Sequence, residues 1–369
     1  MAQESKKADN PLCVLNPAFS RPLVIAGPCS AETEEQTLGT ARALAAHGIK
    51  VFRAGIWKPR TRPNSFEGVG AIGLQWLRKV KQDTGMLIAT EVANAKHVYE
   101  ALKAGVDILW IGARTTVNPF AVQEIADALA GVDIPVLVKN PVSPDLDLWI
   151  GALERLQKAG IIRLGAIHRG FTTHETTHFR NSPHWQIAID LKKRMPAVPV
   201  ITDPSHISGD RRLVYGVAQE AMDLQLDGLM IEAHIAPGEA LSDANQQVTP
   251  DELDAILKRL VLRAPDVADK KFHYTLDELR AQVDLLDKDI ITKLAKRMDI
   301  SEEMGRIKKK SNVTILQPSR WDQILHERQA LGLSKGLSEE FMTRLLNAIH
   351  EESIAHQNLI MNVNQSRDG

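Results

Sequence analysis

The chain has 369 residues, of which 44% are hydrophobic and 25% are charged, and its formal net charge at pH 7 is −1. This length predicts two domains, and the balanced charge argues against nucleic acid or a membrane surface as a partner. No apolar run reaches the ~18 residues of a membrane span, and the polar first residues lack a signal-peptide core. Two cysteines are too few for a disulfide framework. We therefore expect a cytoplasmic enzyme.

Eight short apolar runs recur between residues 22 and 262, each followed by a turn and an amphipathic helical stretch. They are rich in valine and isoleucine without clean alternation, which is typical of parallel strands buried on both faces. The runs cover residues 23–27, 50–55, 86–92, 106–112, 134–140, 161–168, 198–204 and 228–234. Eight strand–helix units in about 240 residues predict an α/β fold, a (β/α)₈ TIM barrel within residues 1–263. An open doubly wound sheet is the alternative, but no GxGxxG follows the first run.

The pattern changes after Arg263, and the polar segment 264–273 is predicted to be a linker. Thr275 and Glu278 have the T-x-x-E spacing of a capping box, and a long amphipathic helix is predicted from there to about residue 310. Its apolar stripe comprises Leu279, Val283, Leu286, Ile290, Leu294 and Met298. About 35 helical residues span roughly 50 Å, so we expect a partner helix from a second chain. Helices at about 319–330 and 338–362, separated by a loop at 332–336, complete an all-α domain over residues 274–369.

Polar residues stand at or just after the ends of the predicted strands. They are Cys29, Arg53, Glu91, Arg114, Lys139, Arg169, His206 and Glu232. In a (β/α)₈ barrel the C-terminal strand ends and the following loops form the active face. We therefore expect these side chains to share one site.

A first group of candidate site residues combines a thiol, an imidazole and two carboxylates: Cys29, His206, Glu232 and Asp243. Taken singly, each residue has an ordinary explanation: in the order given, they could be a small core residue, a turn histidine, an ion-pair partner and a helix cap. Convergence of three strand ends and one adjacent loop on a single barrel mouth favours a metal site instead. This mixed donor set suits a borderline divalent ion such as Mn²⁺, Fe²⁺, Co²⁺ or Zn²⁺.

A second group is cationic and comprises Arg53, Lys58, Arg60, Arg114, Lys139 and Arg169. These charges stand within or against apolar strands, where an unpaired charge is costly. Anionic ligands would compensate them, and guanidinium groups suit phosphate and carboxylate. More than one cluster indicates two phosphorylated substrates or one large one.

Six motifs in the barrel region together resemble 3-deoxy-D-arabino-heptulosonate 7-phosphate (DAHP) synthase, in its type I beta branch, over nearly all of residues 12–262. They are GPCS (27–30), KPRTRPNSFEG (58–68), IGARTTVNP (111–119), VKNP (138–141), HRG (168–170) and DPSHISG (203–209). The KPRT motif separates this family from the sister synthase of 3-deoxy-octulosonate 8-phosphate, which carries KANR there.

The resemblance implies an aldol-like condensation of phosphoenolpyruvate with erythrose 4-phosphate that releases phosphate. It makes Cys29, His206, Glu232 and Asp243 the metal ligands. It assigns Arg53, Lys58, Arg114, Lys139 and Arg169 to phosphoenolpyruvate, and Lys58, Pro59, Arg60 and Thr61 to erythrose 4-phosphate. Glu91 and Lys139 are our candidates for positioning the water. A Schiff-base aldolase with Lys139 as nucleophile is the alternative, and activity that survives a chelator would favour it.

The helical region resembles the all-helical chorismate mutase family through a series of motifs in matching order. They are LR (279–280), KR (296–297), GRIK (305–308), PSR (318–320) and ES-x-x-x-Q (352–357). Arg297 and Lys308 stand eleven residues apart and share a helix face, whereas Arg280 lies roughly 100° away from it. The resemblance implies a three-helix, domain-exchanged homodimer that converts chorismate to prephenate without a cofactor. Arg280 would reach the partner's site, while Arg297, Lys308, Arg320, Ser353 and Gln357 serve their own.

Two positions depart from the mutase pattern. An acidic pair usually flanks the arginine of the second helix, but Gln317 and Trp321 stand there in this chain. A slow mutase, or a non-catalytic sensor or dimerisation domain, is therefore an open alternative. We also expect chorismate or prephenate, bound to this domain, to control the barrel. A related 3-deoxy-sugar-acid synthase and a non-catalytic binding protein remain the competing classes for the whole chain.

Overall fold

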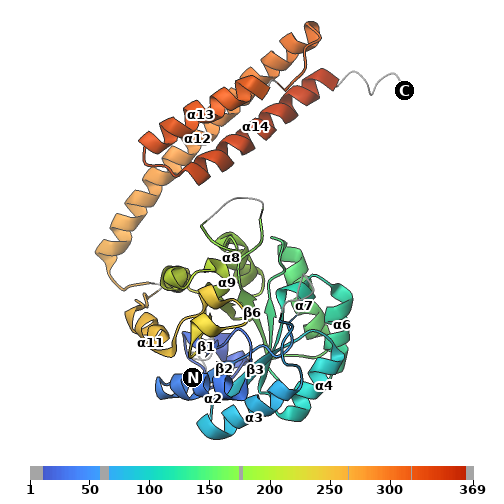
Figure 1. Cartoon of the computed structure of the whole chain (residues 1–369). Helices are drawn as coiled ribbons and strands as arrows, with labels where there is room; N and C mark the ends of the chain where they lie inside the picture. The colour runs from blue at the N-terminus through green and yellow to red at the C-terminus, as the bar shows by residue number, and fades with distance from the viewer. Residues whose placement is uncertain (1–10, 59–65, 174–177, 265, 317, 363–369) are drawn as a thin grey trace. The chain divides into compact units, whose positions relative to one another are not determined.

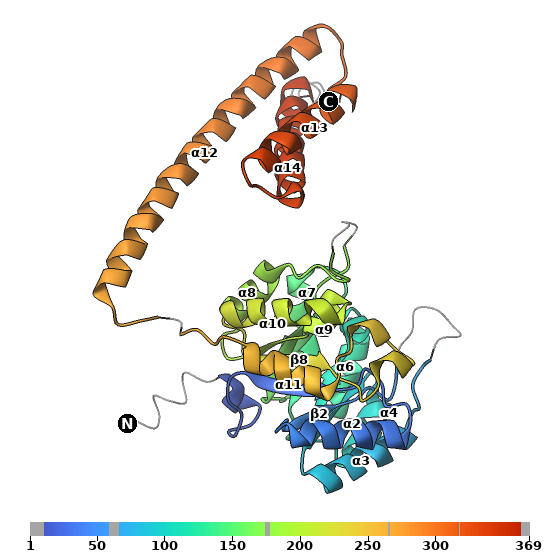
Figure 2. The same ribbon diagram turned by 60° about the vertical axis from the view of Figure 1, so that its left-hand side comes forward.

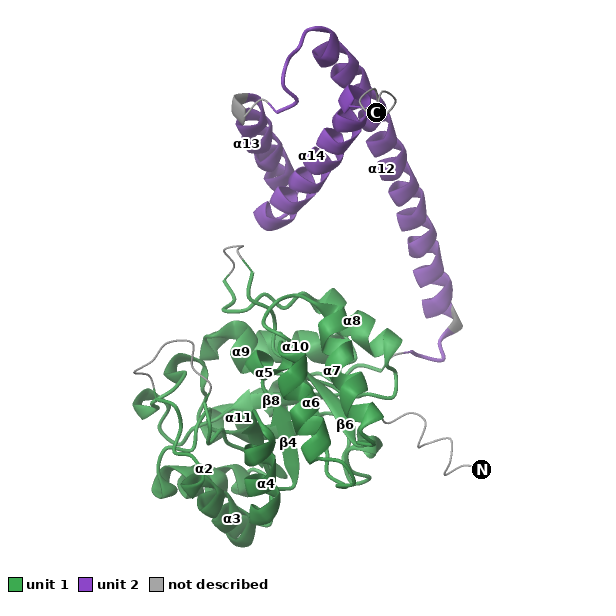
Figure 3. Cartoon of the chain, turned by 90° about the vertical axis from the view of Figure 1, so that its right-hand side faces the viewer, with its two compact units in different colours: residues 1–265 green, residues 266–369 purple. Residues whose placement is uncertain are grey.

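The computed structural model describes residues 11–58, 66–173, 178–264, 266–316 and 318–362. The chain divides into two compact units, Met1–Pro265 and Asp266–Gly369 (Figure 3). None of the described helices is long and apolar enough to cross a bilayer.

The first unit is a closed barrel of parallel strands in which each strand pairs with the next and β8 closes onto β1 (Figure 1). The strands are β1 Leu23–Gly27, β2 Val51–Arg53, β3 Leu87–Val92, β4 Ile108–Ile111, β5 Val136–Lys139, β6 Leu164–His168, β7 Val200–Thr202 and β8 Gly228–Glu232. Each lies within one of the predicted runs. The predicted (β/α)₈ barrel is therefore confirmed.

Helices surround the strands on the outside of the barrel (Figure 2). The α-helices of this unit are α2 Glu34–Ala46, α3 Ile72–Thr84, α4 Ala95–Ala104, α5 Ala113–Thr116, α6 Pro119–Ala128, α7 Leu146–Lys158, α8 Trp185–Arg194, α9 Pro204–Ser208, α10 Val214–Asp223 and α11 Pro250–Arg259. Short 3₁₀ turns are η1 Pro11–Val14, η2 Arg211–Leu213, η3 Pro237–Glu239 and η4 Ala244–Gln246. Side chains cap several N-termini, and Thr249 with Glu252 forms a complete capping box on α11.

The strands sort their side chains with a period of two, as a pleated strand must. One core lies between strands and helices, and a second fills the barrel with residues that include Val51, Ala89, Leu137, Ile201 and Met230. Leu12, Leu15 and Phe19 belong to the same inner core. Two residues after each of the five strand residues Val51, Ala89, Leu137, Ile201 and Met230 comes a polar one. The side chains of this polar layer are Arg53, Glu91, Lys139, Asp203 and Glu232.

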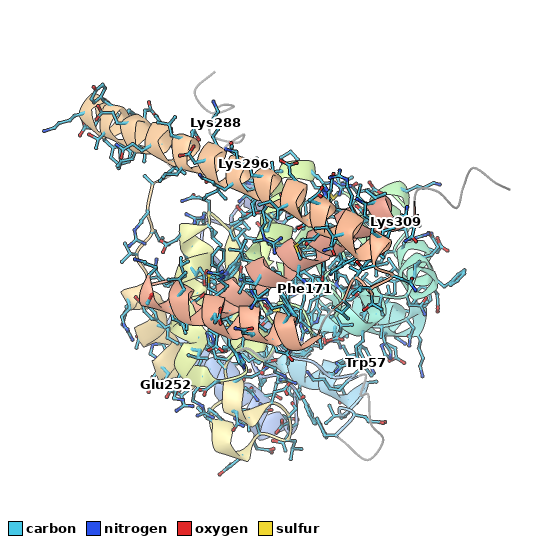
Figure 4. All side chains as sticks on the ribbon, turned by 90° about the horizontal axis from the view of Figure 1, so that it is seen from above. Trp57, Phe171, Glu252, Lys288, Lys296 and Lys309 are labelled. Carbon is cyan, nitrogen blue, oxygen red and sulfur yellow. The ribbon has the colours of Figure 1, made fainter. Side chains whose placement is uncertain are left out.

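The second unit consists of α12 Lys270–Lys310, α13 Pro318–Ser334 and α14 Glu339–Asn362 (Figure 3). Both α12 and α13 pack against α14. At 41 residues, α12 is about 60 Å long. Lys288, Lys296 and Lys309 are exposed along it (Figure 4).

Two predicted boundaries in this region were wrong. Helix α12 begins at Lys270 rather than at Thr275, because the Asp269 side chain accepts a hydrogen bond from the backbone N–H of Lys271 and caps the helix there. Residues 270–273 are thus helical and not linker. Helix α13 continues to Ser334 through Gly332, which was expected in a loop. A Cβ at Gly332 would lie 2.4 Å from Met342 Cγ, so this glycine permits close packing on α14.

Candidate active sites

Three of the four predicted metal ligands converge at the C-terminal end of the barrel. Ligand atoms of Cys29, Glu232 and Asp243 all lie within 4.8 Å of one another. The Cys29 Sγ lies 3.3 Å from Asp243 Oδ2. His206 stands beside this group, with Nε2 3.8 Å from Glu232 Oε1, while its Nδ1 lies 2.8 Å from Asp203 Oδ2.

The chemistry of this group fits a divalent cation. Among the described atoms, the buried Oε1 of Glu232 accepts no hydrogen bond, and a buried carboxylate oxygen normally has a partner. Burial, together with the charge of Glu232, raises the pKa of the Cys29 thiol to about 12. A coordinated metal stabilises a thiolate and would reverse that effect. Although burial opposes it, His206 and Arg180 hold the pKa of Asp243 well below its usual range.

Cationic side chains crowd the same cluster. The Lys58 Nζ lies 3.1 Å from Cys29 Sγ, and Arg180 Nη1 lies 2.9 Å from Asp243 Oδ1. Arg53 is 1% exposed; it donates to the Cys29 carbonyl oxygen at 3.1 Å and lies 3.4 Å from Glu232 Oε1. Its guanidinium carbon is 4.9 Å from the centroid of the Trp110 ring. The predicted site residues Pro59, Arg60 and Thr61 lie outside the described residues.

A cavity of about 230 Å³ opens next to this cluster. Its polar lining comprises Glu91, Arg114, Lys139, Thr172, Arg169, Arg180, Asn181 and His206. Arg169 Nη1 donates to Asn181 Oδ1 at 2.9 Å. Burial lowers the pKa of Arg169 to about 10, and Arg180 and Arg114 act in the same direction. Such crowding of buried positive charge favours an anionic ligand. Arg53 and Lys58, predicted with the other cations, do not line this cavity and lie beside the metal-type cluster.

The carboxylate of Asp203 connects two of the predicted residues. Its Oδ2 accepts from Lys139 Nζ at 2.8 Å and lies equally far from His206 Nδ1, and all three side chains are largely buried. Despite burial, His206 and Lys139 hold the pKa of Asp203 well below its usual range. The sequence interpretation missed this residue, although it opens the DPSHISG motif and stands two residues after an inward isoleucine.

Glu91 is held in place by its neighbours on the barrel wall. The Trp110 indole N–H donates to Glu91 Oε2 at 3.1 Å. A Cβ on Gly112 would lie 2.1 Å from Glu91 Oε1, so the carboxylate uses space that only glycine leaves free. Arg180 and Asn181 come from the loop between β6 and α8 and were also missed. No periodic pattern marks loop residues of this kind.

In the helical unit, four of the predicted mutase residues gather between α12 and α14. Lys308 Nζ donates to Gln357 Oε1 at 3.0 Å, and Gln357 Nε2 donates to the Ser353 carbonyl oxygen at 3.2 Å. Arg297 Nη1 lies 3.5 Å from the carbonyl oxygen of Ile349. Arg320, on α13, is exposed and donates to Gln323 of its own helix.

Arg280 stands apart from this group within one chain. Its side chain is 66% exposed and pairs only with Asp277, at 3.1 Å, among the described residues. Of the two departures from the mutase pattern, Gln317 lies outside the described residues. Trp321 stacks on His350, with ring centroids 3.8 Å apart and planes 12° from parallel.

A closed parallel barrel with carboxylates, a thiol and cations at its C-terminal strand ends defines an enzyme of the (β/α)₈ class. Residues 13–264 match the DAHP synthetase I family, and residues 279–358 match chorismate mutase type II. The chain thus belongs to the DAHP synthetase I family and carries a chorismate mutase domain behind its barrel. The predicted fusion of two enzymes of aromatic biosynthesis is confirmed.

Similar proteins and a solved structure support the assignment of the barrel to this family. The phospho-2-dehydro-3-deoxyheptonate aldolase of Thermotoga maritima is 31% identical over 246 residues, which are 67% of this chain and 70% of that protein. The 2-dehydro-3-deoxyphosphooctonate aldolase of Nitratidesulfovibrio vulgaris is 27% identical and covers 65% of this chain and 91% of its own. The crystal structure of the Thermotoga maritima DAHP synthase superposes with a TM-score of 0.58 at 29% identity, covering 64% of this chain and 67% of that chain.

Proposed function

We propose that the barrel condenses phosphoenolpyruvate with erythrose 4-phosphate to give DAHP and inorganic phosphate. The observation that carries this proposal is the cavity lined by Arg114, Lys139 and Arg169 beside the cluster of Cys29, Glu232 and Asp243. Three cations match a substrate with one carboxylate and one phosphate. The adjacent donor cluster lies where an aldehyde partner would meet the bound enol.

The reaction forms one carbon–carbon bond and one carbon–oxygen bond to water, and it breaks the carbon–oxygen bond to phosphate. The methylene carbon of phosphoenolpyruvate attacks the aldehyde carbon, and the aldehyde oxygen takes up a proton. Water then adds to the cationic carbon, and phosphate leaves with the electron pair of its bond to that carbon. Glu91 and Lys139 line the same cavity and are placed to orient this water, with Asp203 and His206 behind Lys139 to hold a proton.

A divalent ion held by Cys29, His206, Glu232 and Asp243 would supply Lewis-acid polarisation of the aldehyde oxygen. Mn²⁺ is the favoured ion, with Fe²⁺, Co²⁺ or Zn²⁺ as alternatives. Neighbouring side chains that would orient two of these ligands support the proposal: Gln246 donates to Glu232 Oε2 at 2.7 Å, and Asp203 Oδ2 lies 2.8 Å from His206 Nδ1.

The number of carbons in the aldose phosphate is the sharpest test of the proposed barrel activity, because the relatives include enzymes named for seven- and eight-carbon products. Phosphoenolpyruvate supplies three carbons, so the two products need a four- and a five-carbon aldose phosphate. Phosphate release should be faster with erythrose 4-phosphate than with arabinose 5-phosphate. The opposite preference would make the barrel an octulosonate-type synthase.

The Schiff-base alternative is disfavoured by the partner of Lys139. Lys139 Nζ lies 2.8 Å from the buried carboxylate of Asp203, and this ion pair would have to break before the amine could attack a carbonyl. Borohydride added during turnover should leave the mass of the chain unchanged. A substrate adduct on Lys139 would support imine chemistry instead.

We also propose that the helical domain converts chorismate to prephenate. Lys308 and Gln357 are placed to donate to the ether oxygen, where negative charge develops, and the arginines suit the two carboxylates. No cofactor is needed, because the rearrangement is intramolecular and requires a held conformer. Disappearance of chorismate, assayed directly with the full chain, tests this. No turnover would leave a sensor or dimerisation domain.

We also propose a homodimer through the helical domain, and the exposed apolar surface of α12 supports it. Leu279, Val283, Leu286 and Ile290 of its apolar stripe are each more than half exposed, whereas Met298 is buried against α14. A second copy would cover this face and bring its own Arg280 toward the first copy's site. The full chain should therefore elute as a dimer, and Leu286→Asp should shift it toward the monomer.

The fusion also supports a regulatory proposal, in which chorismate or prephenate bound to the helical domain changes the synthase rate. Such coupling requires the ligand to bind two arrangements of the protein unequally. The synthase rate should fall or rise with added prephenate. An unchanged rate at saturating prephenate would leave dimerisation as the role of the fusion.

A further inference from the structure

A pair of stacked rings borders the mutase residues and is not explained by the reaction described above. Trp321 on α13 covers one face of the His350 imidazole on α14, at a centroid separation of 3.8 Å. His350 stands three residues before Ser353, so the two share one face of α14. The neighbouring carbonyl of Ile349 is contacted by Arg297. The stack therefore lies at the edge of the group formed by Arg297, Lys308, Ser353 and Gln357.

The imidazole of His350 is held by stacking and not by hydrogen bonds. Within the part of the chain that the structure describes, neither ring nitrogen of His350 has a hydrogen-bond partner, although the residue is only partly exposed. The charged groups that face it are Arg297 and Lys308 on α12 and Glu351 on its own helix; α13 contributes the uncharged Trp321. Partial burial, followed by the charge of Arg297, lowers the pKa of His350, so the ring is neutral near pH 7. A neutral imidazole offers one acceptor nitrogen.

The substrate requires a hydrogen-bond acceptor, and the other described site residues have theirs already engaged within the protein. Chorismate carries two carboxylates, an ether oxygen and one ring hydroxyl. Arginine and lysine only donate hydrogen bonds, and the Gln357 oxygen already accepts from Lys308. The Ser353 hydroxyl accepts from Gln357 Nε2 at 3.3 Å and lies 2.8 Å from the Ser301 hydroxyl. The proton of the ring hydroxyl is thus left without a partner unless another side chain accepts it, and an unmet hydrogen bond is costly in a desolvated site.

We propose that His350, held in place by Trp321, contacts the substrate and accepts the hydrogen bond of the chorismate ring hydroxyl. This inference rests on the proposed mutase function. It makes Trp321 a positioning residue and His350 a determinant of specificity for a hydroxyl-bearing ring. His350 on α14 would thus replace the acidic residue that the mutase pattern has at position 321.

The test compares full-length variants with chorismate and with its analogue in which the ring hydroxyl is replaced by hydrogen. His350→Leu keeps a side chain of similar size without an acceptor, and should lower kcat/KM for chorismate about tenfold. The same variant should leave kcat/KM for the deoxy analogue unchanged, because that substrate cannot make the bond. His350→Gln restores a neutral acceptor and should recover most of the loss. Equal losses for both substrates would overturn the proposal.

Two further comparisons separate contact from a structural role. Trp321→Phe keeps a stacking ring and should retain most of the kcat/KM for chorismate, whereas Trp321→Ala should lose as much as His350→Leu. His326→Leu, an exposed histidine on α13, is the matched control and should change neither substrate. The KM for chorismate should rise as the pH falls from 8 to 5 in the wild type but not in His350→Gln, since only the imidazole loses its acceptor on protonation. If the wild type turns over chorismate and His350→Leu has the same kinetics, the role of His350 is wrong and the mutase function stands. A wild type without turnover sinks the mutase function as well.

Discussion

The Nζ of Lys139 lies 2.8 Å from Oδ2 of Asp203, and both side chains are buried at the mouth of the barrel. The same oxygen faces Nδ1 of His206. One carboxylate thus contacts both a lysine of the cation-lined cavity and a histidine beside the metal-type cluster.

Asp203→Asn is expected to impair the condensation severely. The change removes the charge while keeping the shape, which leaves the ammonium of Lys139 buried without a counterion. Breaking a buried pair of this kind costs about 3 kcal/mol of stability, and loss of alignment should lower kcat/KM for the condensation about a hundredfold or more. Steady-state kinetics and thermal unfolding measure both effects. The chorismate rate in the same preparation serves as an internal control, and an unaltered condensation rate would contradict this role.

Gly112→Ala should displace Glu91, which lines the same cavity as Gly112. The new Cβ would lie 2.1 Å from Glu91 Oε1, so the carboxylate must move away from the Trp110 indole. We expect kcat of the condensation to fall about tenfold or more, because the water would be poorly oriented. Gly216→Ala on α10 is the matched control, since a Cβ there meets nothing within 4 Å. The account of Glu91 fails if the two alanine variants are equally active.

Arg280 is expected to complete the site of the other subunit. Arg280→Ala and Lys308→Ala chains should each lack chorismate turnover as separate dimers. In mixed dimers both defects fall on one site and the other site is intact, so an equimolar mixture should regain about a quarter of the wild-type rate. Chorismate turnover after subunit exchange measures this. Mixed dimers that form without any recovery would place Arg280 in its own chain's site or outside the mechanism.

Part of the barrel's stability should depend on pH through His168. Burial lowers the pKa of this histidine to about 4, against about 6.5 in an unfolded chain. Because the pKa is depressed in the folded state, the contribution of His168 to the free energy of unfolding is complete above about pH 6.5. It is lost as the pH falls through about 4, by about 3 kcal/mol in total. His168→Gln does not titrate and retains a donor for the Pro183 carbonyl oxygen, which accepts from His168 Nε2 at 2.6 Å. The difference in unfolding free energy between wild type and variant should shrink from pH 7 to pH 4.5. A pH-independent difference would exclude this titration.

Much of the barrel and its polar layer could be predicted from the sequence, because a buried strand reveals itself by a short apolar run and sorts its side chains with a period of two. Glu91, Lys139 and Glu232 follow inward apolar residues at that spacing. Arg180 and Asn181 could not be found in this way, since a loop has no period and their contacts are long-range. Arg53 was predicted at the phosphoenolpyruvate site, and its contacts with Glu232 and Trp110 could not be predicted because they join different strands.

The helical unit shows the same limit. The stripe from Leu279 to Met298 predicted a long helix, but its start depended on the single cap at Asp269. Trp321 was visible as a departure from a pattern, whereas its contact with His350 depends on how α13 packs on α14.

We propose that the chain holds two enzymes and that only the barrel enzyme needs a metal. The most direct measurement follows phosphoenolpyruvate consumption with erythrose 4-phosphate and chorismate disappearance in one preparation of the full chain, before and after exhaustive treatment with EDTA. We expect the chelator to abolish the condensation, Mn²⁺ to restore it, and the chorismate rate to stay unchanged throughout. A condensation that survives complete removal of metal, or a chain that never consumes chorismate, would contradict the account.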